Sequence, residues 1–205
     1  MKKLSDYRAE ARTALKGNWL GSVMLLFVYM IIAGALSFTF QSFGDPEKAT
    51  TSIYSLPANF LILPMMYGVS LAFLGQLRER DMQLGDLFKG YNKRVWLTMI
   101  LYFVYIILWT LLLIIPGWIK SYSYAMTPYI LVDDPEISNN AAIEKSMSMM
   151  QGHKWRLFLL DLTFIGWYIL GAICFFVGMF WAVAYHYQAR AAFYETLKAE
   201  QAEIA

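Results

Sequence analysis

Long hydrophobic blocks separated by short polar stretches dominate the pattern along this chain. The four blocks are Trp19 to Phe40, Leu56 to Leu77, Val95 to Val132 and Leu157 to Tyr194. About 20 apolar residues are enough for a helix to cross the roughly 30 Å hydrocarbon layer of a membrane. The first block has 22 residues and carries no charge. The pattern therefore predicts an all-α, polytopic transmembrane helix bundle.

The third and fourth blocks are too long to be single spans. Each has 38 residues, and a straight helix of that length, at about 1.5 Å per residue, would be nearly twice as long as the membrane is thick. In the third block Pro116 and Gly117 are the expected helix break, because proline lacks a backbone donor and glycine accepts turn geometry. We expect one limb over Val95 to Ile115 and a short return over Gly117 to Val132. The fourth block is expected to turn near Phe175 to Gly178.

Polar residues in the third block indicate how its return limb packs. We expect this limb to lie among other helices and not against lipid, because it contains Lys120, Ser121, Ser123, Thr127 and Pro128.

Basic residues favour six spans over four, because Lys and Arg near span ends are retained in the cytoplasm. Six spans with both termini inside leave only Lys48 and Lys120 outside, so that 15 of the 17 basic residues are cytoplasmic. Four spans would also place Lys145, Lys154 and Arg156 outside. The sequence therefore predicts about six spans, arranged as three hairpins, in the inner (cytoplasmic) membrane of a bacterium, with both termini cytoplasmic.

A polar stretch with helical apolar spacing precedes Trp19, Trp96 and Trp155. The first contains Leu4, Tyr7, Ala11 and Leu15, the second contains Leu84, Leu87, Phe88 and Tyr91, and the third runs from Pro135, with Asp134 as N-cap, through Ile143, Met147 and Met150 to Gly152. These stretches fit ordinary polar connectors. They equally fit cytoplasmic amphipathic helices on the anionic leaflet, where each Lys or Arg contributes about 1 kcal/mol. On the second interpretation the partners are membrane lipids with anionic headgroups.

Composition supports a membrane protein with a single domain over residues 1–205. Hydrophobic residues make up 59% of the chain and charged residues 16%, whereas a soluble domain has about 25% charged residues. Trp19 to Ile32 resembles the apolar part of a signal peptide. Because Asp6 and Glu10 precede it and the apolar run continues to Phe40, we expect a retained first span.

Motifs for known chemistry are missing from the sequence. There is no GxxxxGK[ST] or GxGxxG phosphate loop and no GxSxG nucleophile turn. His153 and His186 do not have the spacing of metal ligands, and the single cysteine, Cys174, excludes a disulfide framework. We therefore expect no enzyme, no catalytic residue, no metal, no cofactor and no nucleic-acid partner.

Ionisable residues inside the fourth block form the one candidate polar cluster. Asp161 lies in its first limb, and His186 and Arg190 lie in its second. Such groups are costly in a membrane and often functional, although side chains near the cytoplasmic ends can also extend to water. A turn about Phe175 and Phe176 places Asp161 and Arg190 at equal depth. We expect them to form an ion pair, with His186 one helical turn away.

Several longer motifs resemble a known bacterial membrane family, domain of unknown function 975. They are LKGNW at 15 to 19, IIPG at 114 to 117, KSYSYAMTPYIL at 120 to 131, DDP at 133 to 135, MMQGHKWRLFLLDLTFIGWYIL at 149 to 170, and FY at 193 and 194. The resemblance implies a multi-pass membrane protein and brings no established activity. The chain is also similar in pattern to the membrane regions of some glycerophosphodiester phosphodiesterases, but we expect no attached hydrolase domain here.

Two functions follow as hypotheses. The first is a non-enzymatic scaffold, envelope-homeostasis factor or accessory component, which fits basic surface helices without catalytic motifs. The alternative is a small-solute or lipid transporter or channel, which fits the broken third block and the charges in the fourth.

Overall fold

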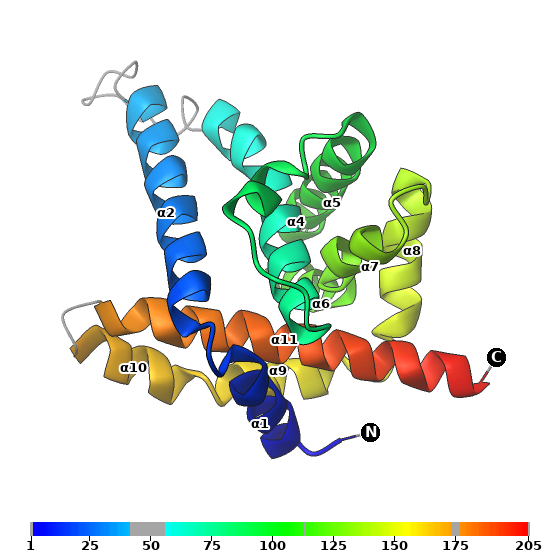
Figure 1. Cartoon of the computed structure of the whole chain (residues 1–205). Coiled ribbons are helices and arrows are strands. Elements are labelled where there is room, and N and C mark those ends of the chain that lie inside the picture. The colour runs from blue at the N-terminus through cyan, green and yellow to red at the C-terminus, as the bar shows by residue number, and fades with distance from the viewer. Residues whose placement is uncertain (1, 42–55, 113, 174–176, 205) are drawn as a thin grey trace.

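The computed structural model describes residues 2–41, 56–112, 114–173 and 177–204, and every regular element in these ranges is helical (Figure 1). An all-α fold is therefore confirmed for the described residues. The α-helices are α1 (Leu4–Leu15), α2 (Trp19–Gln41), α4 (Leu56–Leu77), α5 (Lys93–Leu112), α6 (Ile114–Tyr124), α7 (Thr127–Asp133), α8 (Asn139–Met149), α9 (Lys154–Leu162), α10 (Ile165–Ile173) and α11 (Val177–Ile204). A short 3-10 helix, η1 (Leu84–Phe88), lies between α4 and α5.

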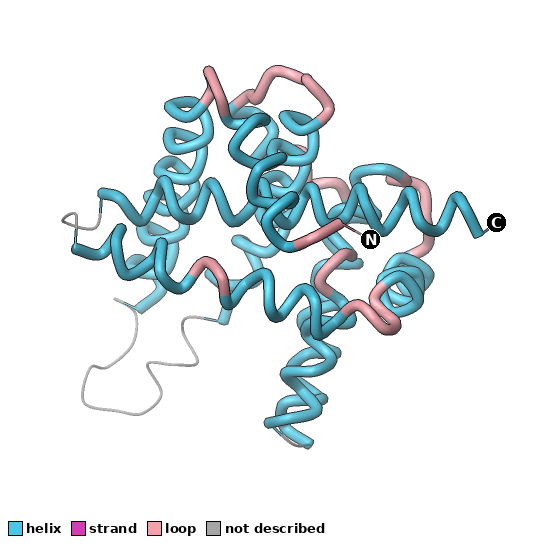
Figure 2. The backbone as a smooth tube through the Cα atoms, turned by 90° about the horizontal axis from the view of Figure 1, so that it is seen from below, coloured by secondary structure: helices cyan, strands magenta, loops and turns pink. Residues whose placement is uncertain are grey.

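The helix α11 organises the packing of the protein. It contacts α1, α2, α4 and α10, which come from both halves of the chain. Its small residues Ala184, Ala189 and Ala192 are fully buried, and this allows the neighbouring helices to approach closely. Figures 1 and 2 show α10 and α11 running across the direction of α2 and not alongside it.

The break in the third block comes earlier than predicted. Helix α5 ends at Leu112 and α6 begins at Ile114, so Pro116 and Gly117 lie in the first turn of α6. Proline is tolerated there because the first turn has no backbone donors that need a helical partner. A Cβ at Gly117 would lie 2.6 Å from Thr110 Oγ1, so this glycine allows α5 and α6 to pack closely.

The return limb of the third block is buried only in its second part, although burial of the whole limb was predicted. It consists of α6 followed by α7, and Ser123, Thr127 and Pro128 are buried, whereas Lys120 and Ser121 are partly exposed and the α6 residues Trp118 and Ile119 are 64% and 52% exposed. Ser123 satisfies its hydroxyl by donating to the carbonyl of Ile119 at 3.1 Å.

The fourth block forms a hairpin with an additional break that was not predicted. Helix α9 ends at Leu162 and α10 begins at Ile165, and the Thr163 hydroxyl donates to the Leu160 carbonyl at 2.7 Å. The helices α10 and α11 then pack against each other. The predicted turn residue Phe175, like Cys174 and Lys48, lies outside the described residues.

The prediction of about six spans is not confirmed. Four stretches of the described residues are long and apolar enough to cross a membrane: Trp19–Phe38, Phe60–Leu77, Lys93–Leu112 and Lys154–Ile173. Helices α6 and α7 have only 11 and 7 residues, and α11 contains too many polar residues to qualify. These four stretches indicate a membrane protein.

The predicted amphipathic helices differ from one another in the structure. Helix α1 forms as expected, but its apolar face is covered by protein: Tyr7 is fully buried and its ring lies 5.2 Å from that of Phe193 on α11. The second stretch is the 3-10 helix η1. The third is α8, whose N-cap is Ser138. Asp134 was wrongly predicted as this N-cap, because α7 extends to Asp133 and Asp134 is its C-cap.

Candidate functional site

The ion pair predicted between Asp161 and Arg190 is present where α9 meets α11. Arg190 donates through Nε to Asp161 Oδ1 at 3.0 Å and through a terminal nitrogen to Oδ2, so the guanidinium holds both carboxylate oxygens. This two-point geometry fixes orientation and is stronger than a single contact. The Asp161 side chain is 14% exposed and the Arg190 side chain 31% exposed, so the pair joins the two helices in a partly buried environment.

His186 extends this cluster along α11. Its Nε2 lies 2.7 Å from Asp161 Oδ1, and its Nδ1 lies 2.6 Å from the Tyr168 hydroxyl on α10. A neutral imidazole that donates from Nε2 to Asp161 accepts the Tyr168 proton at Nδ1, so both ring nitrogens are satisfied. The ring of Phe164 stacks on the imidazole at 4.7 Å. Asp161, His186 and Arg190 therefore lie together as one cluster, and Tyr168 is a fourth member that the sequence did not reveal.

A cavity of about 240 Å³ adjoins this cluster. It lies among α4, α5, α6, α7 and α11, and its lining includes Arg190, Ser70, Tyr102, Tyr129 and Tyr187. Asp161, His186 and Tyr168 do not line it. The cavity therefore reaches the cluster through Arg190 and through Tyr122, which also lines it and interacts with Asp161. An Asp–His–Tyr chain can hold or relay a proton, but His186 and Tyr168 do not line this space.

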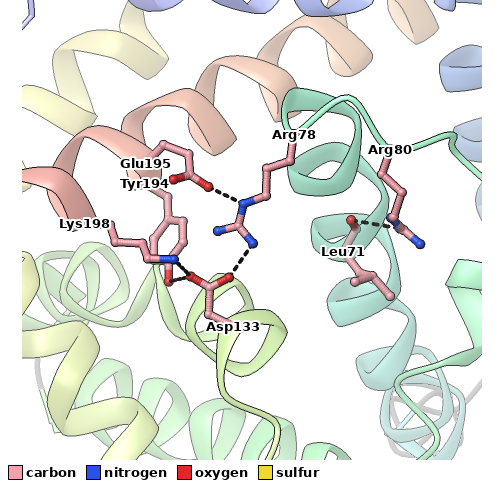
Figure 3. A network of polar contacts seen from close by, with 7 residues as sticks. All are labelled: Leu71, Arg78, Arg80, Asp133, Tyr194, Glu195 and Lys198. Atoms are coloured by element: carbon pink, nitrogen blue, oxygen red, sulfur yellow. Dashed lines mark hydrogen bonds and ion pairs between the residues drawn. The ribbon is translucent and has the colours of Figure 1, made fainter.

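A second charge network, which the sequence did not reveal, joins the ends of three helices (Figure 3). Asp133, at the end of α7, accepts from Arg78 Nη1 at 2.6 Å, from Lys198 Nζ at 2.6 Å and from the Tyr194 hydroxyl at 2.9 Å. Arg78 also donates from Nε to Glu195 Oε1 at 2.6 Å. The network ties the end of α4 and the end of α7 to the last third of α11.

The charge on Asp133 is stabilised by these partners. Burial opposes ionisation, but hydrogen bonds from Arg78, Lys198 and Tyr194 outweigh it and lower the pKa of Asp133 to about 2. Asp133 is therefore held as a carboxylate, and a structural role is favoured at this position over a pH-sensing one.

A third network is centred on the buried residue Asp86 in η1. Its side chain is 0% exposed, and it accepts from Arg80 Nη2 at 2.8 Å and from Lys89 Nζ at 2.6 Å. Burial raises the pKa of this carboxyl, but the hydrogen bonds with Lys89, Arg80 and the Gln83 backbone lower it by more. The net result is a pKa below the usual value for aspartate. The network fixes the connection between α4 and α5.

The donor sets of these networks do not suggest a metal centre. Across residues 2–41, 56–112, 114–173 and 177–204, no group of three or more His, Cys, Asp or Glu side chains is arranged to hold an ion. The three carboxylates at the centres of the networks are instead paired with cations from the protein itself.

Residues 50–201 match the family described as "Protein of unknown function (DUF975)". The chain belongs to the DUF975 family. No curated protein and no solved structure matches it. The resemblance inferred from the sequence motifs is thereby confirmed, and it assigns no activity to this DUF975 protein.

The positions of charged residues after the hydrophobic blocks weakly indicate the networks that were not predicted from the sequence. In this DUF975 protein Arg78 directly follows the second hydrophobic block, Asp133 directly follows the third, and Glu195 directly follows the fourth. Charges at the ends of blocks that share one side of a membrane can meet. Which of them meet depends on how α7 and α11 cross, and the sequence does not specify this crossing.

Proposed function

We propose that this DUF975 protein is a non-enzymatic integral component of the bacterial cytoplasmic membrane that acts as a scaffold or accessory subunit. The observation that carries the proposal is the mutual pairing of its buried charges. Asp161, Asp86 and Asp133 each accept hydrogen bonds from at least two side chains of the protein. Catalytic groups need an accessible substrate site beside them, whereas Asp161 and Asp133 join helices and Asp86 fixes the connection between α4 and α5.

For the transmembrane topology, we propose that three helical hairpins enter the membrane from the cytoplasmic side. The last hairpin enters the membrane only part of the way. Trp19 begins α2, and tryptophan prefers the membrane interface. Its ring lies 6.2 Å from that of Tyr185 on α11. Only eight residues separate Tyr185 from the start of α11 at Val177, which is about 12 Å of helix. From the level of Trp19, the last hairpin therefore reaches less than half of the roughly 30 Å hydrocarbon layer.

Fusion reporters test this threading. Reporters placed after Asp134 and after Ala205 should both show a cytoplasmic location, and one placed near Lys48 should show the outside, because the basic residues then concentrate in the cytoplasm. A periplasmic signal after Asp134 or Ala205 would rule out the proposed topology.

The single cysteine distinguishes a partial hairpin from two complete spans. Cys174 lies in the sequence between the end of α10 and the start of α11. The cells are first freed of the envelope layers outside the cytoplasmic membrane, which itself stays intact. A membrane-impermeant thiol reagent should then leave Cys174 unmodified, whereas a Lys48→Cys, Cys174→Ser control should react. Rapid modification of Cys174 would favour complete fifth and sixth spans.

A transporter of small solutes or lipids is the second candidate function. It is favoured by the cavity of about 240 Å³, because Arg190 and several residues with hydroxyl groups line that cavity between the helices. Within the described residues, the Tyr102 and Tyr187 hydroxyls at this cavity have no hydrogen-bond partner. A solute with acceptor atoms would satisfy them.

A further inference from the structure

A cavity of about 450 Å³ lies away from the polar cluster, where α1, α2, α10 and α11 meet. Its walls include the indole rings of Trp19, Trp167 and Trp181 and the phenol ring of Tyr185. The Trp167 and Trp181 side chains remain 39% and 41% exposed, so the cavity is open at its rim. Its size and its apolar, aromatic lining are typical of a site for a small hydrophobic ligand.

One charged residue, Arg12, stands at the edge of this apolar cavity. Its guanidinium carbon lies 5.9 Å from the centre of the Tyr185 ring, and this contact holds the charge over the aromatic wall. Among the described lining residues there is no carboxylate. A ligand that fills the cavity therefore presents its polar end to a cation.

Arg12 belongs to a stripe of three cations that runs along α1 to its C-cap. Arg8 and Arg12 are four residues apart on one helix face, and Lys16 is the C-cap residue. Within the described part of the chain, none of the three forms an ion pair. The two acidic residues of α1 are engaged elsewhere, because Glu10 pairs with Lys2 at 2.7 Å and Asp6 accepts from the Lys3 backbone at 2.9 Å. The stripe therefore keeps its positive charge available for an external anion.

The chain turn after α1 places this stripe beside the cavity. Helix α1 ends at Leu15, and Gly17 adopts a positive φ of 92°, which allows α2 to begin at Trp19 in a new direction. The Tyr185 hydroxyl donates to the Arg8 carbonyl at 2.9 Å and holds α1 against α11. Cations and tryptophans are thus fixed around one opening.

We propose that this cavity binds one anionic phospholipid of the cytoplasmic leaflet, with part of an acyl chain among the tryptophans and the phosphate at Arg12. The inference rests on the proposed cytoplasmic placement of α1. Charge complementarity selects the occupant: an apolar body fits the cavity, and a phosphate fits the unpaired cations, since arginine binds phosphate through two parallel hydrogen bonds. A zwitterionic lipid carries a second, positive group that the stripe would repel.

Lipid-dependent thermal stability of the purified full-length protein tests the site. In neutral detergent, phosphatidylglycerol should raise the midpoint of unfolding more than phosphatidylcholine with the same acyl chains, and soluble glycerol phosphate should have no effect. Arg12→Gln should weaken the apparent affinity for phosphatidylglycerol about tenfold, the change expected when one hydrogen bond between charged groups is lost. Trp181→Ala should weaken the binding of both lipids.

Lys145→Gln is the matched control, because Lys145 is an exposed cation on α8 and lies outside the cavity lining. It should leave the preference for phosphatidylglycerol unchanged. Equal stabilisation by the two lipids, or a preference that survives Arg12→Gln, would overturn the proposed site. The same conclusion follows if Trp181→Ala converts a dimer into a monomer without changing lipid binding, because the surface would then be an interface between copies.

Failure of this site can be told apart from failure of the proposed function. If alkaline carbonate leaves the protein in the membrane pellet but no lipid preference is found, only the lipid site is wrong. If carbonate releases the protein without detergent, the membrane placement fails, and the lipid site fails with it.

Discussion

Asp161→Arg and Arg190→Asp are each expected to remove most of the folded protein, and the double exchange is expected to restore most of it. Each single variant leaves like charges facing each other across α9 and α11. Breaking a buried ion pair costs about 3–5 kcal/mol, a large part of a total stability of about 5–15 kcal/mol. The yield of monodisperse protein after detergent extraction and its unfolding midpoint measure the effect.

Restoration by the double exchange should be incomplete. The position of Asp161 also serves His186, whose Nε2 lies 2.7 Å from Oδ1, and an arginine there cannot accept that hydrogen bond. The exposed Lys2–Glu10 pair is the control, because its exchange should change stability by less than about 1 kcal/mol. A double Asp161/Arg190 variant as unstable as the sum of the single variants would show that the two residues do not act as a pair.

Gly68→Ala and Gly90→Ala are expected to destabilise the protein strongly. A Cβ at Gly90 would lie 2.0 Å from the Pro64 carbonyl oxygen, and a Cβ at Gly68 would lie 2.5 Å from the Asp86 carbonyl oxygen. Both obstacles are backbone atoms, so no side chain can rotate away. Overpacking of this kind typically costs about 1–3 kcal/mol, and each unfolding midpoint should fall accordingly.

Gly85→Ala is the matched control for these substitutions. Gly85 lies in η1, close in sequence to both contact regions, but a Cβ there meets nothing within 4 Å. Its effect should stay within about 0.5 kcal/mol. If all three variants lose stability equally, close backbone packing of α4 on the η1 segment is not the cause.

The sequence predicted those features that depend on spacing along the chain. The limits of α4 were predicted correctly as Leu56 to Leu77, because the block is bounded by polar residues at both ends. The pairing of Asp161 with Arg190 was predicted because both residues lie equally far from one turn. The break at Pro116 was displaced, because a proline in the first turn of a helix costs nothing and sequence alone cannot distinguish that position from a break.

Features that depend on how helices cross could not be predicted. The apolar face of α1 has the pattern expected for lipid contact, but Tyr7 and Ala11 are buried by protein. An amphipathic pattern specifies that a face is covered and not what covers it. In the same way, hydrophobic length suggested that the fourth block crosses the membrane twice, whereas in the topology we propose the contact between Trp19 and Tyr185 limits how deep its hairpin can reach.

The most direct test of the central claim, that the buried charges lock helices together and do not conduct protons, is a proton-flux measurement. Purified protein would be reconstituted into vesicles that contain a pH-sensitive dye, and a potassium diffusion potential would be imposed with valinomycin. We expect the same rate of internal pH change for the wild type and for His186→Gln, since glutamine can still donate to Asp161 and the helix contact persists. A wild-type rate several times higher than that of a folded His186→Gln variant would contradict it and identify the Asp161–His186–Tyr168 chain as a proton path.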